Sequence, residues 1–240
     1  MNKKIFYKRV KEEAEKIDIE LNEEQQEKFY KYIDLLLEWN GKINLTTIVD
    51  PEEIIIKHII DSLTVTKYLE EATSMVDIGT GAGFPGIPLK IARPNLKITL
   101  VDSLNKRIRF LKEVENQLEL NKIEEIHSRA EEFGKNADFR EKYDIAISRA
   151  VARLNILVEY LLPTVRLGGR CICMKGPDCN QEIQEAEKAI NLLGGKIDEV
   201  CEFSLPDSDL KRTIIVIKKE KNTPNKFPRK AGIPAKNPLK

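Results

Sequence analysis

The most constraining feature of the sequence is a glycine-rich segment that follows a short apolar run. Met75–Ile78 has the character of a buried strand, and it leads into three alternating glycines, Gly79, Gly81 and Gly83, ahead of a helical pattern from about Pro85. Glycine adopts positive φ without steric cost and lets a ligand approach the backbone, while a helix start offers free N–H groups. We therefore expect a strand, a tight turn that can bind a nucleotide-like ligand, and a helix.

Strand-like and helix-like segments alternate over the rest of the chain, which is typical of a doubly wound α/β sheet. A short polar loop, Pro206–Lys211, joins the last two expected strands and favours an antiparallel pair at the end of the sheet. We predict a Rossmann-like α/β fold with a mostly parallel sheet and an antiparallel last strand. The expected strands are 75–78, 98–101, 123–127, 144–148, 169–174, 196–203 and 213–218, and the expected helices are 104–120, 154–162 and 182–193 together with the one near Pro85.

The first seventy residues predict a helical cap on this core. Residues 3–17 and 23–39 have amphipathic patterns, and Asn22 with Gln25 three positions later forms a capping-box signature. Gly41 is expected to end the second helix in a left-handed conformation, and Asp50 followed by Pro51 to begin another. The expected organisation is a cap at 1–70, a core at 71–219 and a tail at 220–240, all in one compact unit.

The tail carries a charge that the total conceals. The chain has a net charge of +1, but residues 218–240 contain eight basic residues and one acid, so this end carries +7 and the remainder −6. A concentrated basic end on an acidic body suggests a polyanionic partner. Four prolines spaced among the lysines predict an extended segment that becomes ordered only when bound. Either it is a solvated, flexible end, or it contacts RNA through Lys226, Phe227, Arg229 and Lys230.

Composition excludes several classes of protein. No apolar run approaches the ~20 residues that cross a bilayer, and the start of the chain does not resemble a signal peptide, so we expect a cytoplasmic protein. Cys171 and Cys173 alternate along an expected strand, and neither lies in a CxxC pair or near a histidine. This spacing favours buried reduced thiols over a metal site, and we expect no metal.

A carboxylate strengthens the ligand hypothesis. Asp102 ends the expected strand after the glycine turn, where it can accept hydrogen bonds from both hydroxyls of a ribose. Gly81, Gly83 and Gly86 also fit the dinucleotide pattern, so a nicotinamide-dependent oxidoreductase is an alternative. Asp77 favours a cofactor with a cationic amino-acid end, and the antiparallel last strand favours methyltransferase topology. A tight turn without a ligand, or an RNA-binding module without activity, also fits the pattern.

Several motifs in order along nearly the whole chain carry a family resemblance. The sequence resembles RsmG or GidB, the small bacterial methyltransferases that modify N7 of a guanine in 16S ribosomal RNA. The matching segments are 39–46 (WNGKINLT), 58–62 (HIIDS), 77–86 (DIGTGAGFPG), 101–107 (VDSLNKR), 129–131 (RAE), 148–152 (SRAVA), and 222–230 (NTPNKFPRK) in the tail.

The resemblance implies S-adenosylmethionine as cofactor and 16S rRNA, or a small ribosomal subunit particle, as partner of a monomer. The three glycines of the turn and Phe84 would hold the methionine end of the cofactor. Asp102, with Ser103 beside it, would hold the ribose, and Ala130 and Glu131 would hold the adenine. Arg149 would lie near the cofactor and the target base, with a surface salt bridge as the alternative.

The resemblance also bears on the reaction. Guanine N7 already presents a lone pair, so the reaction needs no general base, and the sequence offers no catalytic triad. Asn44 and Thr46 are candidates for the target pocket, with helix-loop packing as the alternative. His58 is expected to be structural, and Lys175 to meet phosphate or remain solvated.

Overall fold

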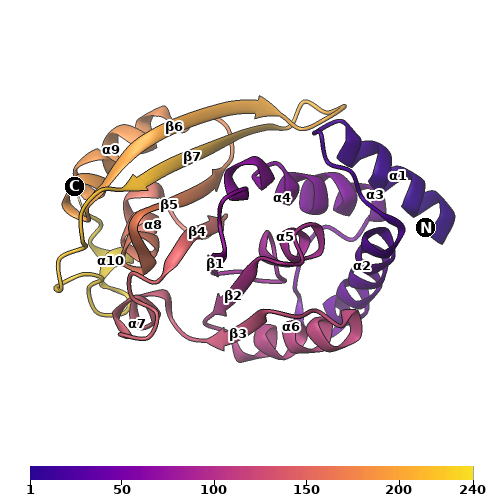
Figure 1. Ribbon diagram of the computed structural model, residues 1–240, viewed down its shortest axis with the longest axis horizontal. Coiled ribbons are helices and arrows are strands. Elements are labelled where there is room, and N and C mark those ends of the chain that lie inside the picture. The colour runs from indigo at the N-terminus through magenta and orange to yellow at the C-terminus, as the bar shows by residue number, and fades with distance from the viewer. Residues whose placement is uncertain (240) are drawn as a thin grey trace.

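The computed structural model describes residues 1–239 and contains one seven-stranded sheet in the order β3-β2-β1-β4-β5-β7-β6 (Figure 1). Neighbouring strands from β3 to β5 are parallel, whereas β7 is antiparallel to both β5 and β6. The predicted fold class and the antiparallel final pair are confirmed. The strands are β1 (Ser74–Ile78), β2 (Lys97–Asp102), β3 (Ile123–His127), β4 (Tyr143–Arg149), β5 (Val165–Lys175), β6 (Gly195–Ser204) and β7 (Lys211–Lys219).

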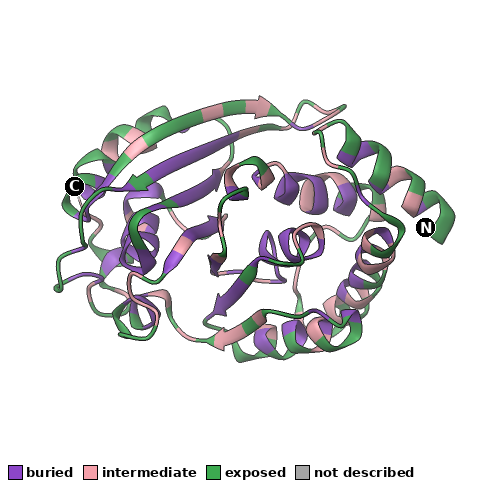
Figure 2. Ribbon diagram, viewed as in Figure 1, coloured by how far each residue is buried: buried purple, intermediate pink, exposed green. Residues whose placement is uncertain are grey.

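Helices cover both faces of this sheet because the central strands are apolar on both sides. Along β4, Ile145 and Ile147 face one core, while Ala146 faces the other. In Figure 2 the central strands β1, β2 and β4 are coloured mostly as buried. One core packs against α5 (Gly86–Ala92) and α6 (Asn105–Leu118), and the other against α7 (Ala130–Lys135), α8 (Leu154–Leu161) and α9 (Asn180–Leu192).

The N-terminal helices share the first of these cores. α1 (Lys3–Glu15) and α2 (Glu23–Ile43) contribute Phe6, Phe29 and Tyr32 to the cluster that contains residues of β2 and α6. The predicted capping box is present, because Asn22 and Gln25 accept from each other's backbone N–H. The helical region therefore packs directly on the sheet.

The predicted end of α2 is wrong. Gly41 lies inside the helix, which continues to Ile43, and Asn44 takes the left-handed conformation at φ 51°. The side chain of Asn40 explains this ending, because its Oδ1 accepts from the backbone N–H groups of Leu45 and Thr46 at 2.7 and 2.8 Å. A side chain inside the last turn, rather than a glycine, redirects the chain.

The segment after α2 begins as predicted, with Asp50 capping α3 (Pro51–Ile54). It then forms a π-helical turn at Ile55–Ile60, followed by α4 (Asp61–Leu63) and a 3-10 turn at Thr66–Leu69. π-helical turns occur often at functional sites. This one carries His58.

The tail was predicted to be extended and to become ordered only when bound; the body of the protein itself binds residues 220–239, and Lys240 lies outside the described residues. The tail packs beside α7 and α8 and ends in a short helix, α10 (Ile233–Lys236) (Figure 1). Arg140 donates to the carbonyl oxygens of Thr223 and Phe227, both at 2.7 Å. The prolines do prevent long helices and strands, but side chains of the body bind the backbone groups that remain.

Two sequence inferences concern features outside the site. Cys171 and Cys173 are buried with free thiols, as predicted, and burial raises the pKa of Cys173 to about 12. Within residues 1–239, no helix has the length and apolar character needed to cross a membrane.

Candidate cofactor and substrate site

The glycine turn between β1 and α5 has the backbone that the sequence predicts. Gly79, Gly81 and Gly83 have φ values of 74°, 63° and 99°, all in the region that disfavours other residues. A Cβ at Gly79 would lie 2.5 Å from Val151 Cγ2, and one at Gly83 2.5 Å from Ile87 Cγ1, whereas one at Gly81 would meet nothing within 4 Å. Gly79 and Gly83 therefore allow close packing, and Gly81 exposes its backbone to open space.

Asp77 braces this turn from inside. Its side chain is fully buried, and Oδ2 accepts from Thr80 Oγ1 at 2.7 Å and from the Gly86 N–H at 2.9 Å. Burial raises the pKa of Asp77 to about 6, although these two hydrogen bonds favour the carboxylate. Asp77 does not line the cavity beside the turn, but its Oδ1 is buried without a hydrogen-bond partner among the described residues, so its contact with a cationic cofactor end stays a prediction.

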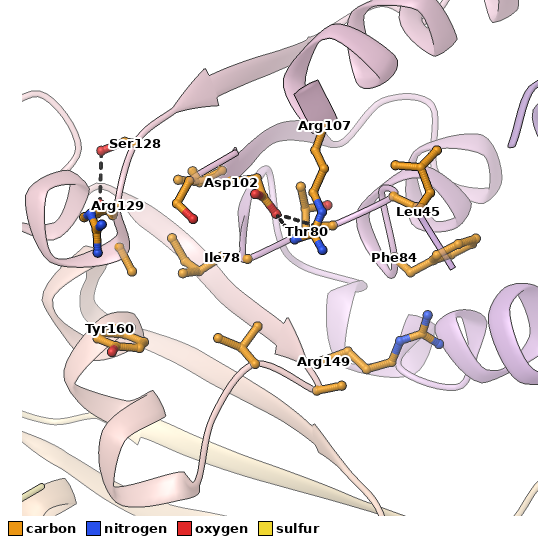
Figure 3. Close-up of a pocket in the computed structure, with 18 of the residues that line it drawn as sticks. Leu45, Ile78, Thr80, Phe84, Asp102, Arg107, Ser128, Arg129, Arg149 and Tyr160 are labelled. Atoms are coloured by element: carbon orange, nitrogen blue, oxygen red, sulfur yellow. Dashed lines mark hydrogen bonds and ion pairs between the residues drawn. The ribbon is translucent and has the colours of Figure 1, made fainter. Parts of the chain in front are cut away.

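A cavity of about 540 Å³ lies at the carboxyl edge of β1, β2 and β4 (Figure 3). This volume lies within the range of ~300–1,000 Å³ that is usual for small-molecule sites. Of the predicted site residues, Gly83, Asp77 and Asn44 do not line it. Those that do are Thr46, Gly79, Gly81, Phe84, Asp102, Ser103, Ala130, Glu131 and Arg149.

The Asp102 carboxylate is held in place at the centre of the cavity wall. Oδ2 accepts from the Gly81 N–H at 3.0 Å and from Arg107 Nη1 at 3.1 Å, and Oδ1 accepts from the Leu104 N–H at 2.9 Å. A carboxylate has about four acceptor positions, so it can still accept from a ligand hydroxyl. Arg107 also lines the cavity and was not predicted as a site residue, although it lies five residues after Asp102 and within the matched segment 101–107.

Arg149 lies in a network that sequence reasoning did not find. Its Nη1 donates to Asp61 Oδ2 at 2.9 Å, and Arg212 donates to Asp61 Oδ1 at 3.0 Å. The guanidinium also lies 5.2 Å from the centre of the Phe84 ring (Figure 3). Asp61 is only 3% exposed, so Arg149 takes part in a largely buried cluster and not in a surface salt bridge.

His58 belongs to the same cluster, where it stacks on Phe84 and is neutral. Its ring lies 4.4 Å from that of Phe84, and Nε2 is hydrogen-bonded to Thr46 Oγ1 at 2.9 Å. Burial, reinforced by the charge of Arg149, lowers the pKa of His58 to about 4. Thr46 lines this first cavity and not the second one described below, whereas Asn44 is exposed at the end of α2, so their place in a target pocket stays a prediction.

A second cavity of about 480 Å³ adjoins the first. The two cavities share His58, Arg149 and Ala150. Lys175 lines the second one, where its Nζ donates to Glu182 Oε1 and to the Ala152 carbonyl, each at 2.7 Å. It is therefore neither a solvated lysine nor an unpaired phosphate ligand.

The C-terminal tail reaches the far side of the first cavity. The Gly232 N–H donates to Glu131 Oε1 at 2.8 Å, and Gly232 and Ala235 line the cavity. Phe227 is 4% exposed, so it has no free ring face on which a base could stack, and Arg229 is bound to Glu159. The RNA-contact prediction is wrong for Phe227 and unsupported for Arg229, while Lys226 and Lys230 are exposed.

Comparison with known proteins identifies the family. Residues 25–213 match the family described as GidB, rRNA small subunit methyltransferase G. A ribosomal RNA small subunit methyltransferase G of Alkaliphilus oremlandii is 52% identical over 233 residues, which cover 96% of this chain and 98% of the relative. The protein of the same name from Clostridium novyi is 50% identical and covers 99% of both chains. The chain belongs to this family.

Solved structures with lower identity share the fold. A precorrin-6y C5,15-methyltransferase from Geobacter metallireducens has a TM-score of 0.51 at 15% identity and covers 74% of this chain and 92% of its own. A SAM-dependent O-methyltransferase from Thermotoga maritima has the same TM-score at 15% identity and covers 79% of this chain and 73% of its own. The predicted methyltransferase fold and the predicted family membership are confirmed.

Proposed function

We propose that this chain transfers a methyl group from S-adenosylmethionine to N7 of a guanine in 16S ribosomal RNA. One observation supports the proposal above others: the open backbone at Gly81 and the carboxylate of Asp102 face one cavity, which meets a second cavity at Arg149. Two joined cavities suit a cofactor and a target base that must react with each other. The names of the relatives point to RNA of the small subunit as the source of that base.

The residues of the first cavity fit this cofactor. A Cβ at Gly81 would project into the open space where a ligand must approach the turn. Asp102 retains capacity to accept from a ribose hydroxyl next to that turn, and Ala130 and Glu131 follow β3, where an adenine would lie. The membership of the family favours this cofactor over a nicotinamide dinucleotide, which the glycine spacing alone allows.

The chemistry demands positioning more than proton transfer. S-adenosylmethionine supplies an electrophilic methyl group, and guanine N7 offers a lone pair that carries no proton. The residues of this chain therefore have to align the base and exclude water, an effect that can account for several kcal/mol of a barrier. A neutral His58 and a charge-compensated Arg149 at the junction of the cavities agree with that task.

The partner and the setting follow from the same proposal. Lys226 and Lys230 are exposed on the tail and would contact RNA phosphates, with 16S rRNA or a small-subunit particle as the substrate. We propose that the protein acts in the cytoplasm as a monomer.

The decisive experiment measures transfer of a labelled methyl group. Small-subunit particles from cells that lack the modification should incorporate label from S-adenosylmethionine, and sequencing should map it to one guanine. Fully modified particles are the matched control and should remain unlabelled. If unmodified particles incorporate no label although the protein binds S-adenosylhomocysteine, the enzyme proposal is wrong and an RNA-binding module without activity takes its place. Thermal stabilisation by NADH instead would indicate an oxidoreductase.

A further inference from the structure

The geometry points to the C-terminal segment 229–236 as a part of the cofactor site: it forms the wall that encloses the nucleoside half of the ligand. This inference rests on the proposed function. Within this segment, Arg229 and Lys230 were predicted from the sequence to contact RNA.

Arg229 anchors the segment to the body. Glu159, on α8, is fully buried, and its carboxylate accepts from the Arg229 backbone N–H at 2.8 Å, from Nε at 2.9 Å and from Nη2 at 2.6 Å. Such a charge-assisted, two-pronged contact is geometrically specific. Pro228, the residue before it, contacts Gly134 of α7, where a Cβ would lie 3.2 Å from the proline ring. The segment therefore has a defined position on α7 and α8.

From this anchor the chain turns onto the cavity. Gly232 has φ 81°, and its N–H donates to Oε1 of Glu131, which is 6% exposed. Ala235, on α10, lines the cavity together with Gly232. The tail thus both fixes the Glu131 carboxylate and supplies two surfaces of the wall.

The position of this wall identifies which half of the ligand it meets. In Figure 3, Arg149 and Phe84 lie on one side of the cavity, Arg129 and Tyr160 on the opposite side, and Asp102 between them. A cofactor whose ribose binds Asp102 would have its sulfonium end toward Arg149 and its adenine base toward Ala130 and Glu131. Because the tail binds Glu131, it meets the base. The ligand class that it recognises is an adenine nucleoside.

Truncation of the chain tests this assignment. A variant that ends at Ala231 keeps the Arg229–Glu159 contact but lacks both lining residues, and a control that ends at Asn237 keeps them. We expect the shorter variant to bind S-adenosylhomocysteine and 5′-methylthioadenosine at least about tenfold more weakly, equivalent to ~1.4 kcal/mol. The control should bind both like the full chain. Isothermal calorimetry measures the affinities, and thermal unfolding confirms that each variant is folded.

A point substitution in the full chain gives a second, independent readout. Ala235→Trp places a large side chain at the cavity wall and should weaken binding of both compounds, whereas Lys236→Trp, on the same short helix but outside the lining, should not. Equal affinities for the full chain, the truncated chain and Ala235→Trp would overturn the inference and leave the cofactor assignment intact. If the full chain binds neither compound, the proposed cofactor itself is wrong, which is a different result.

Discussion

Substitution of Gly81 by alanine should separate ligand binding from folding. The residue has φ 63°, and a left-handed conformation costs an alanine roughly 1–2 kcal/mol. No atom lies within 4 Å of the added Cβ, so no clash increases this cost. A loss of 1 kcal/mol lowers Tm by about 2–4 °C in a chain of this size, so we expect a fall of roughly 2–8 °C. The added methyl group occupies space that the cofactor needs.

Two other glycines provide matched controls. Gly168 has φ 77°, and a Cβ there meets only Arg166 Nη1 at 3.9 Å, so Gly168→Ala introduces the same backbone strain away from the cavity. Gly83 has φ 99°, and its Cβ would lie 2.5 Å from Ile87 Cγ1 and 3.0 Å from Leu111 Cδ2. Overpacking of a core adds about 1–3 kcal/mol to the strain, so Gly83→Ala should be clearly less stable than the other two variants.

The assay pairs thermal unfolding with calorimetric titration of S-adenosylhomocysteine. Gly81→Ala and Gly168→Ala should unfold at similar temperatures, and only Gly81→Ala should lose affinity, by about tenfold or more, equivalent to ~1.4 kcal/mol. If Gly81→Ala binds as tightly as Gly168→Ala, the open backbone at position 81 is not the surface that the cofactor approaches, and our reading of the turn is refuted.

Three further predictions concern charge. Asp102→Asn should weaken S-adenosylhomocysteine binding by about 1.5–3 kcal/mol in calorimetry, because charge-assisted contacts to ribose are lost, and unchanged affinity would contradict the ribose role. Because the folded-state pKa of His58 is lowered to about 4, the unfolded chain binds this proton first, so His58 should destabilise the fold as pH falls from about 6.5 to 4. The difference in unfolding free energy between wild type and His58→Gln should change over that range and stay constant above pH 7; a constant difference throughout would contradict it. Replacing Lys226 and Lys230 by glutamine should reduce the slope of log RNA affinity against log salt by about 1.4–1.8 without changing cofactor affinity, and an unaltered slope would exclude these phosphate contacts.

The sequence predicts the sheet well because its signals are local. Apolar runs bounded by turn residues identify the strands, and each observed strand contains the predicted range. The glycine turn and Asp102 are predictable for a related reason, since the carboxyl ends of neighbouring parallel strands converge at one edge. Burial of Asp77 was not predictable in this way, because whether a carboxylate at a strand end points into the cavity or under the turn depends on its partners, Thr80 and Gly86.

The cluster around Arg149 has no local signal. Asp61 and His58 come from a helical segment before the sheet. Arg212 comes from β7 and lies 151 residues after Asp61 in the chain. Each residue alone resembles an ordinary helix or strand residue. Only the packing of that segment on the edge of the sheet reveals that two arginines share one buried carboxylate.

The tail shows why counting charges overestimates an RNA-binding surface. Of the eight basic residues from Lys218 onward, Lys219 is 1% exposed and donates to the Leu162 carbonyl at 2.6 Å, and Arg229 binds the buried carboxylate of Glu159. If either cation left for RNA, a buried acceptor, the Glu159 carboxylate or the Leu162 carbonyl, would lose its partner at a cost that a surface contact with phosphate does not return. The charge available to a polyanion is therefore smaller than the +7 of the composition, and it belongs to the exposed lysines alone. The same contacts that withdraw Arg229 from RNA hold residues 232–236 against the cavity, so the basic tail of the sequence is, in the folded protein, largely a structural element beside the proposed cofactor site.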